Sequence, residues 1–274
     1  MNLQKNTAPS LRQLLSIEWM KLRHYKAFWM ITGFFVLLLP LWNYGISNGV
    51  MKLGPGNDLN LVSQSYGFQN VWQNVGFWAS IFVIFISILT IIITTNEYQF
   101  RTHRQNIMDG WSRLSFYHAK WSLILALSLG TTLYVFIVGT AFGMQYSSLS
   151  AFPGNIEYLL YTFILSLNYY GFAFIIALFL KRSGISIGMF FLYSMIIESM
   201  LVKYINWQTN SSFGNFLPLQ CSDELLPFPI MEMVKGILVG ESTSPTATTY
   251  ACVSIVWIAV YYFVGRWKLL KSDW

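Results

Sequence analysis

The residues best suited to chemistry are concentrated in one stretch, NEYQFRTHRQNIMDGWSRLSFYHAK, which covers residues 96–120. It holds four basic side chains, two acids and two of the three histidines, namely Arg101, Arg104, Arg113, Lys120, Glu97, Asp109, His103 and His118. Only 10% of the whole chain is charged, so this density is unusual. Two interpretations fit it: a short polar helix that docks against a separate cytosolic protein, or a solvated connection.

Motifs for catalysis are missing from the chain. It has no Gly-x-x-x-x-Gly-Lys-Ser/Thr loop for nucleotide phosphates and no Gly-x-Ser-x-Gly turn for a nucleophilic serine. The three histidines, which include His24, are too widely spaced to suggest a metal pair. We therefore expect no enzyme activity, no catalytic residue, no metal site and no cofactor bound by this chain.

The elements that must position the polar stretch are apolar blocks of about 20 residues, the length that crosses a bilayer core as a helix. There are six, at Ala27–Ile46, Phe77–Thr95, Trp121–Phe142, Tyr158–Leu180, Gly184–Val202 and Thr249–Val264. They lack the alternation of barrel strands. The chain is thus predicted to be an all-α integral membrane protein with six transmembrane helices, and Glu198 is the one acid inside a span.

The charge distribution predicts the orientation. With the N-terminus in the cytoplasm, 14 of the 17 Lys and Arg residues fall on the cytoplasmic side, which is the positive-inside pattern. Both termini are therefore expected in the cytoplasm. The net charge of +6 then reflects topology and contact with anionic lipid in the bilayer, and no nucleic-acid partner is expected.

The remaining segments complete the expected organisation. Residues 1–26 form a cytosolic tail whose part 11–26 is an amphipathic helix in the membrane interface, with Leu15, Trp19 and Leu22 on its apolar face. Residues 27–265 form the six-span domain, and residues 266–274 a second cytosolic tail. Within residues 206–247, apolar pieces separated by acids and prolines predict short helices that re-enter the outer membrane leaflet.

Several motifs together resemble the ABC-2-type permeases, the membrane subunits of ABC exporters. They are EWMKLRHYKAFWM with Glu18, Lys21 and Arg23; Glu97-Tyr98 at the end of the second span; Thr102, Ser112-Arg113 and Lys120 after it; and NFLPL before the sixth span. The chain departs from the family pattern at Arg101, where a Gly often stands, and at Gly110-Trp111, where a Pro often precedes Ser-Arg.

The resemblance implies a partner and a mechanism. Residues 97–113 would be the coupling helix, inserted into a cleft of a cytosolic ABC ATPase subunit that binds the ATP and Mg²⁺. The permease would pair with a second copy or a paralogue in the cytoplasmic membrane of a bacterium and export a substrate whose identity stays open. The coupling residues implied are Glu97, Tyr98, Arg101, Thr102, Arg104 and Arg113. The alternative function is a non-transporting scaffold of a secretion, motility or resistance complex.

Polar residues inside the spans have two interpretations each. Glu198, Asn43, Tyr44, Asn168 and Tyr169 either line a transport path or satisfy neighbouring helices. For Glu198 we expect a partner hydroxyl, Lys203, or a protonated carboxyl. Glu97 is expected to pair with Arg113, Lys120 or an ATPase residue, or to be an ordinary interfacial charge.

Small residues raise similar choices. Gly184 and Gly188 form a Gly-x-x-x-Gly pair that permits close helix contact, as do Gly139 and Gly143; the contact is either a dimer interface or packing within the chain. Cys221 and Cys252 are either a disulfide or two unrelated small residues.

Overall fold

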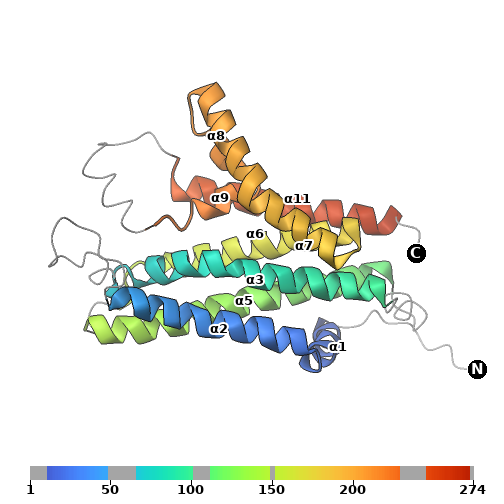
Figure 1. Cartoon of the computed structure of the whole chain (residues 1–274), viewed down its shortest axis with the longest axis horizontal. Coiled ribbons are helices and arrows are strands. Elements are labelled where there is room, and N and C mark those ends of the chain that lie inside the picture. Colours follow the sequence, from blue (N-terminus) through green and yellow to red (C-terminus); the bar gives the residue numbers. More distant parts are fainter. Residues whose placement is uncertain (1–10, 49–65, 101–111, 149–151, 229–244, 272–274) are drawn as a thin grey trace, which may run out of the picture.

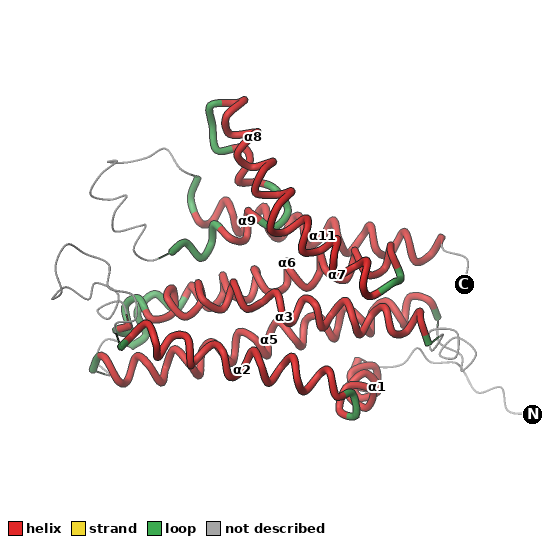
Figure 2. Tube along the Cα trace, in the orientation of Figure 1, coloured by secondary structure: helices red, strands yellow, loops and turns green. Residues whose placement is uncertain are grey.

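The computed structural model describes residues 11–48, 66–100, 112–148, 152–228 and 245–271. Within them it contains helices and loops and no strand (Figure 2). The helices, in chain order, are α1 (Leu11–Arg23), α2 (Lys26–Ser47), α3 (Val71–Gln99), α5 (Arg113–Tyr146), α6 (Glu157–Leu180), α7 (Ser183–Phe191), the π-helical η3 (Leu192–Ile197), α8 (Glu198–Thr209), the 3₁₀-helical η4 (Phe213–Phe216), α9 (Gln220–Asp223) and α11 (Ala247–Lys271).

Six helices in this described part are long and apolar enough to cross a membrane, which confirms the six-span all-α prediction. The fifth, Ser183–Thr209, combines α7, η3 and α8. Several helices extend beyond the apolar blocks. For example, α3 begins at Val71 rather than Phe77, and α5 runs from Arg113 to Tyr146.

Helix α3 lies at the centre of the bundle, between α2, α5 and α6, and α11 packs on the far side of α6 (Figure 1). Gly139 of α5 leaves the space that the Trp72 ring of α3 occupies, since a Cβ at position 139 would lie 2.7 Å from that ring. Gly143 makes the same room for the Phe68 ring. This Gly-x-x-x-Gly pair therefore serves packing within the chain.

Pro40 interrupts the hydrogen bonds of α2 without breaking the helix. Proline has no N–H, so the carbonyl of Val36, four residues earlier, loses its partner within the helix. The Tyr134 hydroxyl of α5 donates to that carbonyl instead. A neighbouring helix thus replaces the missing bond, as membrane helices that contain proline require.

Beyond η3, α8 leaves the bundle at a steep angle, and the chain then returns through η4 and α9 to pack against α6 and α11 (Figure 1). The Trp257 indole of α11 donates to the Phe216 carbonyl, and Asn168 of α6 donates to the Pro218 carbonyl. Two short helices, η4 and α9, are thus present in the described part of residues 206–247, and their re-entry into the outer membrane leaflet stays a prediction.

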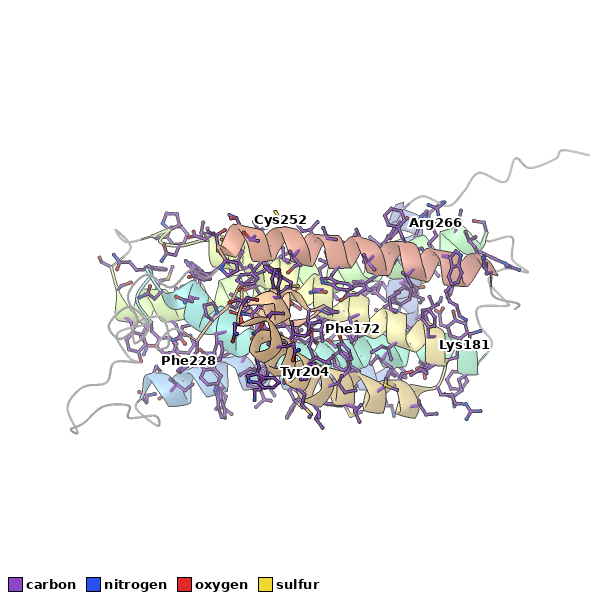
Figure 3. All side chains as sticks on the ribbon, turned by 90° about the horizontal axis from the view of Figure 1, so that it is seen from above. Phe172, Lys181, Tyr204, Phe228, Cys252 and Arg266 are labelled. Carbon is purple, nitrogen blue, oxygen red and sulfur yellow. The ribbon has the colours of Figure 1, made fainter. Side chains whose placement is uncertain are left out.

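The two ends of the bundle are formed by different parts of the chain. The start of α5, the end of α3, helix α1 and the last turns of α11 share one end (Figure 1). Lys181 and Arg266 lie toward that same end, and Phe228 lies toward the other (Figure 3). Among the described residues, Lys21, Arg113, Lys120, Lys181 and Arg266 lie toward this end, and its cytoplasmic location stays a prediction from the charge count.

Candidate functional site

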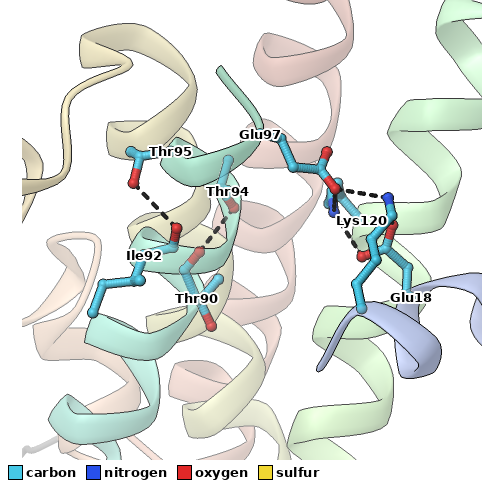
Figure 4. Close-up of polar contacts among 8 residues, drawn as sticks. Glu18, Thr90, Ile92, Thr94, Thr95, Glu97 and Lys120 are labelled. Carbon is cyan, nitrogen blue, oxygen red and sulfur yellow. Dashed lines mark hydrogen bonds and ion pairs between the residues drawn. The ribbon is translucent and has the colours of Figure 1, made fainter. Parts of the chain in front are cut away.

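Four ionisable side chains meet at the basic end of the bundle, where α3 ends and α5 begins (Figure 4). The Lys120 Nζ lies 2.6 Å from Glu18 Oε2 and 2.7 Å from Glu97 Oε1. The Lys21 Nζ lies 2.9 Å from Glu97 Oε1 and 3.1 Å from Glu18 Oε1. We call these four residues the charge cluster. It joins three helices that are far apart in sequence.

Local structure places each member. The Ser112 hydroxyl accepts a hydrogen bond from the Ser115 N–H, which fixes the start of α5 and puts Lys120 two turns into it. Glu97 occupies the last turn of α3. Glu18 lies on the inner face of α1 one turn before buried Leu22, so α1 docks with its acid facing inward.

Burial makes the charge cluster costly to disturb. Lys120 and Glu18 are each 1% exposed and Glu97 is 6% exposed, whereas the side chain of Lys21 is 34% exposed. Two acids and two lysines balance, so the charge cluster as a whole is neutral. Burial alone would raise the pKa of Glu18, but Lys120 and Lys21 outweigh it and hold that pKa below its usual value of 4.5.

Further contacts fasten the end of α3. The Asn96 amide donates to the Tyr25 hydroxyl at 3.0 Å, and the Lys181 ammonium lies 5.3 Å from the centre of the Tyr98 ring. Beside the charge cluster, a cavity of about 200 Å³ opens between α1 and α3, with Asn96 and Phe100 in its wall. The end of α3 is thus tied to the linker before α2 and to the loop before α7.

The start of α5 is fastened to α11. An Arg113 guanidinium N–H donates to the Leu270 carbonyl at 3.0 Å. The Tyr117 hydroxyl donates to the Tyr262 carbonyl, and the His118 ring nitrogen lies 3.1 Å from the Tyr262 hydroxyl. The start of α5 is therefore tied both to α1, through Lys120, and to α11.

The predicted coupling residues are placed only in part. Among the alternatives for Glu97, the structure gives Lys120 and adds Lys21. Arg113 binds α11, and Tyr98 faces Lys181. The other three, Arg101, Thr102 and Arg104, lie outside the described residues, and the coupling role of the whole set stays a prediction.

Sequence reasoning missed Glu18 as a member of the site. Trp19, which was assigned to the apolar face of the first helix, is 50% exposed, and Leu15 is 37% exposed. The face that meets the bundle holds Leu22, which was expected on the apolar face, together with Glu18, which was not. An acid on the inward side of an amphipathic helix, one turn from a buried leucine, was the available signal.

Away from the charge cluster, Glu198 has partners that the sequence did not predict. Its Oε1 accepts the backbone N–H groups of Leu219, at 2.7 Å, and Gln220, at 3.0 Å. The expectation of a hydroxyl or Lys203 as partner was therefore wrong; Lys203 is exposed. The π-helix η3 directly precedes Glu198 and shifts its register by one residue per turn, and Glu198 is 2% exposed on the inner side.

The other candidates for a transport path are mostly tied within the protein. Asn43 donates to the Leu39 carbonyl and accepts from the Tyr66 hydroxyl; Asn168 donates to the Ser222 hydroxyl and Pro218 carbonyl; Tyr169 donates to the Asp223 carboxylate. Tyr44, in contrast, is 58% exposed. These contacts favour the role of satisfying neighbouring elements, and the transport-path role stays a prediction.

The structure answers the questions about the Gly184/Gly188 pair and about the two cysteines. A Cβ at Gly184 or Gly188 would meet nothing within 4 Å, so this pair does not serve packing against the part of the chain that the structure describes. Cys221 and Cys252 are free thiols, and burial raises the pKa of Cys221 to about 11. Among the described residues, no group of three His, Cys, Asp or Glu side chains is arranged to hold a metal.

Comparison with known families identifies the bundle. The family described as ABC-2 family transporter protein matches residues 14–197, which include Glu18, Glu97 and Lys120. The chain belongs to the ABC-2 transporter family. As an ABC-2 protein it is a multi-pass membrane component of transport, and this membership implies association with an ABC ATPase and often dimerisation. It matches no curated protein.

Proposed function

We propose that this ABC-2 protein is the permease subunit of an exporter in the cytoplasmic membrane of a bacterium, driven by a separate ATPase subunit. The ATPase docks on residues 96–120 and holds the ATP and Mg²⁺. The observation that carries the proposal is the charge cluster. A buried lysine ties the last turn of α3 and an early turn of α5 to the interfacial helix α1.

The charge cluster is placed to transmit a movement of the α3–α5 connection to the attached helices. Residues 101–111 connect α3 to α5, so a partner that moves them acts on the two helix ends that Lys120 holds together. Since Lys120 also binds Glu18, α1 must follow or its buried ion pair must break. Contacts from Arg113 to α11 extend the same movement to the sixth span.

The docking is tested by purification of the tagged chain in mild detergent, with mass spectrometry of what accompanies it. The informative variant is Arg101→Glu/Arg104→Glu, because Arg113 has an internal contact whose loss would confuse the result. Lys203→Glu is the control, since it reverses a positive charge on an exposed residue of α8, away from the proposed docking segment. We expect an ATPase subunit with the wild type and the control but not with the double variant.

An ATPase that binds all three proteins equally contradicts docking at residues 96–120. If no ATPase accompanies the wild type even when ATP hydrolysis is blocked, the exporter assignment fails and the scaffold function takes its place. Size-exclusion profiles of all three proteins establish that each is folded.

We further infer that a second permease copy packs against α7. Gly184 and Gly188 have open space on this helix, and Ile185 and Met189 beside them are 52% and 45% exposed. Small residues flanked by apolar ones allow close approach of a partner helix.

Cysteine cross-linking in membranes tests this interface. In a Cys252→Ser background, which removes the exposed native thiol, Gly188→Cys is expected to form a disulfide-linked dimer. Leu133→Cys, which is 60% exposed on α5, is the control and is expected to stay monomeric. Equal cross-linking of both variants would argue for random collision.

A further inference from the structure

A groove on the flank of the bundle has no role in the proposed coupling. It encloses about 210 Å³ between α2, α3 and α5. Its floor is Ile86 of α3, and its walls include Phe35 of α2 and Leu127 of α5. This volume exceeds the roughly 150 Å³ of an apolar cavity that binds benzene, so it can hold a substantial apolar group.

The groove opens sideways, toward the region that lipid occupies around a spanning bundle. Ala126 and Gly130 on its α5 rim are exposed, and a Cβ at Gly130 would meet nothing within 4 Å. At its far end, Tyr134 is fixed by the hydrogen bond to the Val36 carbonyl. A chain-like ligand can therefore enter from the bilayer and end against Tyr134.

One polar atom in the wall is left over. The Thr32 hydroxyl is buried and finds no hydrogen-bond partner in the described part of the protein. Other threonines of the spans donate to the carbonyl four residues earlier, as shown by Thr90, Thr94, Thr131, Thr132, Thr140 and Thr162. A hydroxyl buried without a partner is costly, so a ligand with an acceptor would remove that cost.

The depth of Thr32 indicates which acceptor is near. Thr32 lies six residues into α2, about 9 Å from its first residue, and three residues, or about 4.5 Å, beyond Trp29. The Trp29 side chain is 54% exposed and donates to the Arg23 carbonyl, as expected of an aromatic anchor at the headgroup level. The ester groups that join lipid headgroups to acyl chains lie just below that level.

We propose that the groove binds one acyl chain of a glycerophospholipid from the leaflet on the α1 side, and that Thr32 donates a hydrogen bond to the ester carbonyl of that chain. The lipid then fills the gap between α2 and α5 along α3. Its methylene chain lies against Phe35, Ile86 and Leu127, and Gly130 leaves the space through which it enters. This site is independent of ATPase docking.

Photo-cross-linking tests where the chain lies. The purified protein is reconstituted in vesicles of diether phosphatidylcholine, which lacks the ester carbonyl, with 1 mol % of an ester-linked phosphatidylglycerol that carries a diazirine in the middle of one acyl chain. Gly130→Leu fills the groove, and Gly33→Leu is the matched control, because Gly33 has equal open space on α2 but does not line the groove. Leucine favours a helix over glycine, so both variants are expected to fold.

We expect cross-links within residues 28–36 and 126–134 in the wild type and in Gly33→Leu. They should fall at least tenfold in Gly130→Leu. Cross-links spread evenly over the lipid-facing helices, or unchanged by Gly130→Leu, would show ordinary annular lipid and overturn the site.

Competition tests the hydrogen bond. Unlabelled diester phosphatidylglycerol should displace the photoprobe about fivefold better than the diether analogue, which lacks the carbonyl, as expected for one net hydrogen bond. Thr32→Val should abolish that preference, and Thr140→Val should keep it, because the Thr140 hydroxyl is satisfied within its own helix. No ester preference in the wild type, or equal competition by free palmitate, would overturn the assignment of a glycerophospholipid ester.

Discussion

Replacement of Lys120 by methionine is the sharpest test of the charge cluster. The substitution keeps most of the length of the side chain and removes the cation that joins Glu18 to Glu97. Two acids, 1% and 6% exposed, are then left with Lys21 as their shared cation, and the Lys21 side chain is 34% exposed. The cluster also changes from neutral to a net negative charge.

The size of the destabilisation expected from Lys120→Met follows from the burial of the charge cluster. Removal of one partner from a buried ion pair costs about 3–5 kcal/mol, and this cost is borne where α1 meets α5. At about 1.36 kcal/mol for each factor of ten, backbone amides protected by α1 docking should exchange roughly two to three and a half orders of magnitude faster. The control Lys268→Met removes only a cation 5.1 Å from the Phe179 ring, worth about 0.5–1 kcal/mol.

Hydrogen exchange with mass spectrometry, carried out in detergent, measures the loss of amide protection directly over residues 13–23 of α1. Glu18→Gln/Lys120→Met, which restores the charge balance, should recover at least half of the lost protection. If Lys120→Met loosens α1 no more than Lys268→Met does, the charge cluster does not hold α1, and the coupling argument built on it fails.

Acid should release α1 by the same interaction. Because the folded-state pKa of Glu18 lies below its unfolded value of 4.5, its stabilisation is fully present above that value and is lost as pH falls through the folded pKa. The protection of α1 amides, taken relative to the intrinsic exchange rate at each pH, should therefore be full at pH 5 and decrease in stronger acid. In Lys120→Met the main opposing charge is gone, so the release should begin at higher pH.

Three further predictions concern packing and titration elsewhere. Burial, reinforced by neighbouring acids, raises the pKa of Asp223 to about 8. The stabilisation from the protonated Asp223 is therefore present below the ordinary pKa near 4 and is lost as pH rises toward 8. Asp223→Asn should flatten this pH dependence of the free energy of unfolding, measured in mixed micelles. Gly139→Ala should lower the free energy of unfolding by about 1–3 kcal/mol, because its Cβ would strike the Trp72 ring, whereas Gly184→Ala should leave that of the monomer unchanged or raise it by up to about 1 kcal/mol; equal effects would contradict the packing. Tyr134→Phe should cost about 1–2 kcal/mol in the wild type and less in a Pro40→Ala background, where the restored N–H can reach the orphaned carbonyl; identical costs in both backgrounds would refute the pairing.

The sequence predicts the spans well because the bilayer imposes a length and a composition on each one. It also names Lys120 among the partners of Glu97, and the N-cap Ser112 that starts α5 is of a residue type that favours a helix start. These features depend on local pattern. Residues within one helix or at its ends decide them.

The partners of Glu18 and Glu198 depend instead on the fold. Glu18 meets Lys120 across 102 positions, and nothing in the spacing of either helix sets their relative rotation. Glu198 accepts hydrogen bonds from the backbone N–H groups of Leu219 and Gln220. Every residue except proline has such a group, so the residue types do not indicate which ones will bind a carboxyl. The π-helix before Glu198, which changes the face of α8 that looks inward, is equally silent in sequence.

Polar ties in two parts of the bundle constrain different movements. At the basic end the bonds are between side chains, and Lys21 and Lys120 each bind both acids, so one lysine can release an acid while the other still holds it. Beside the middle of α6, Glu198 binds backbone N–H groups of the returning segment, and these groups cannot exchange one partner for another as the two lysines can. Under the proposed function, small displacements of α3 and α5 are therefore easier at the end where the ATPase would act. The returning segment after α8 resists such displacements until the hydrogen bonds of Glu198 break.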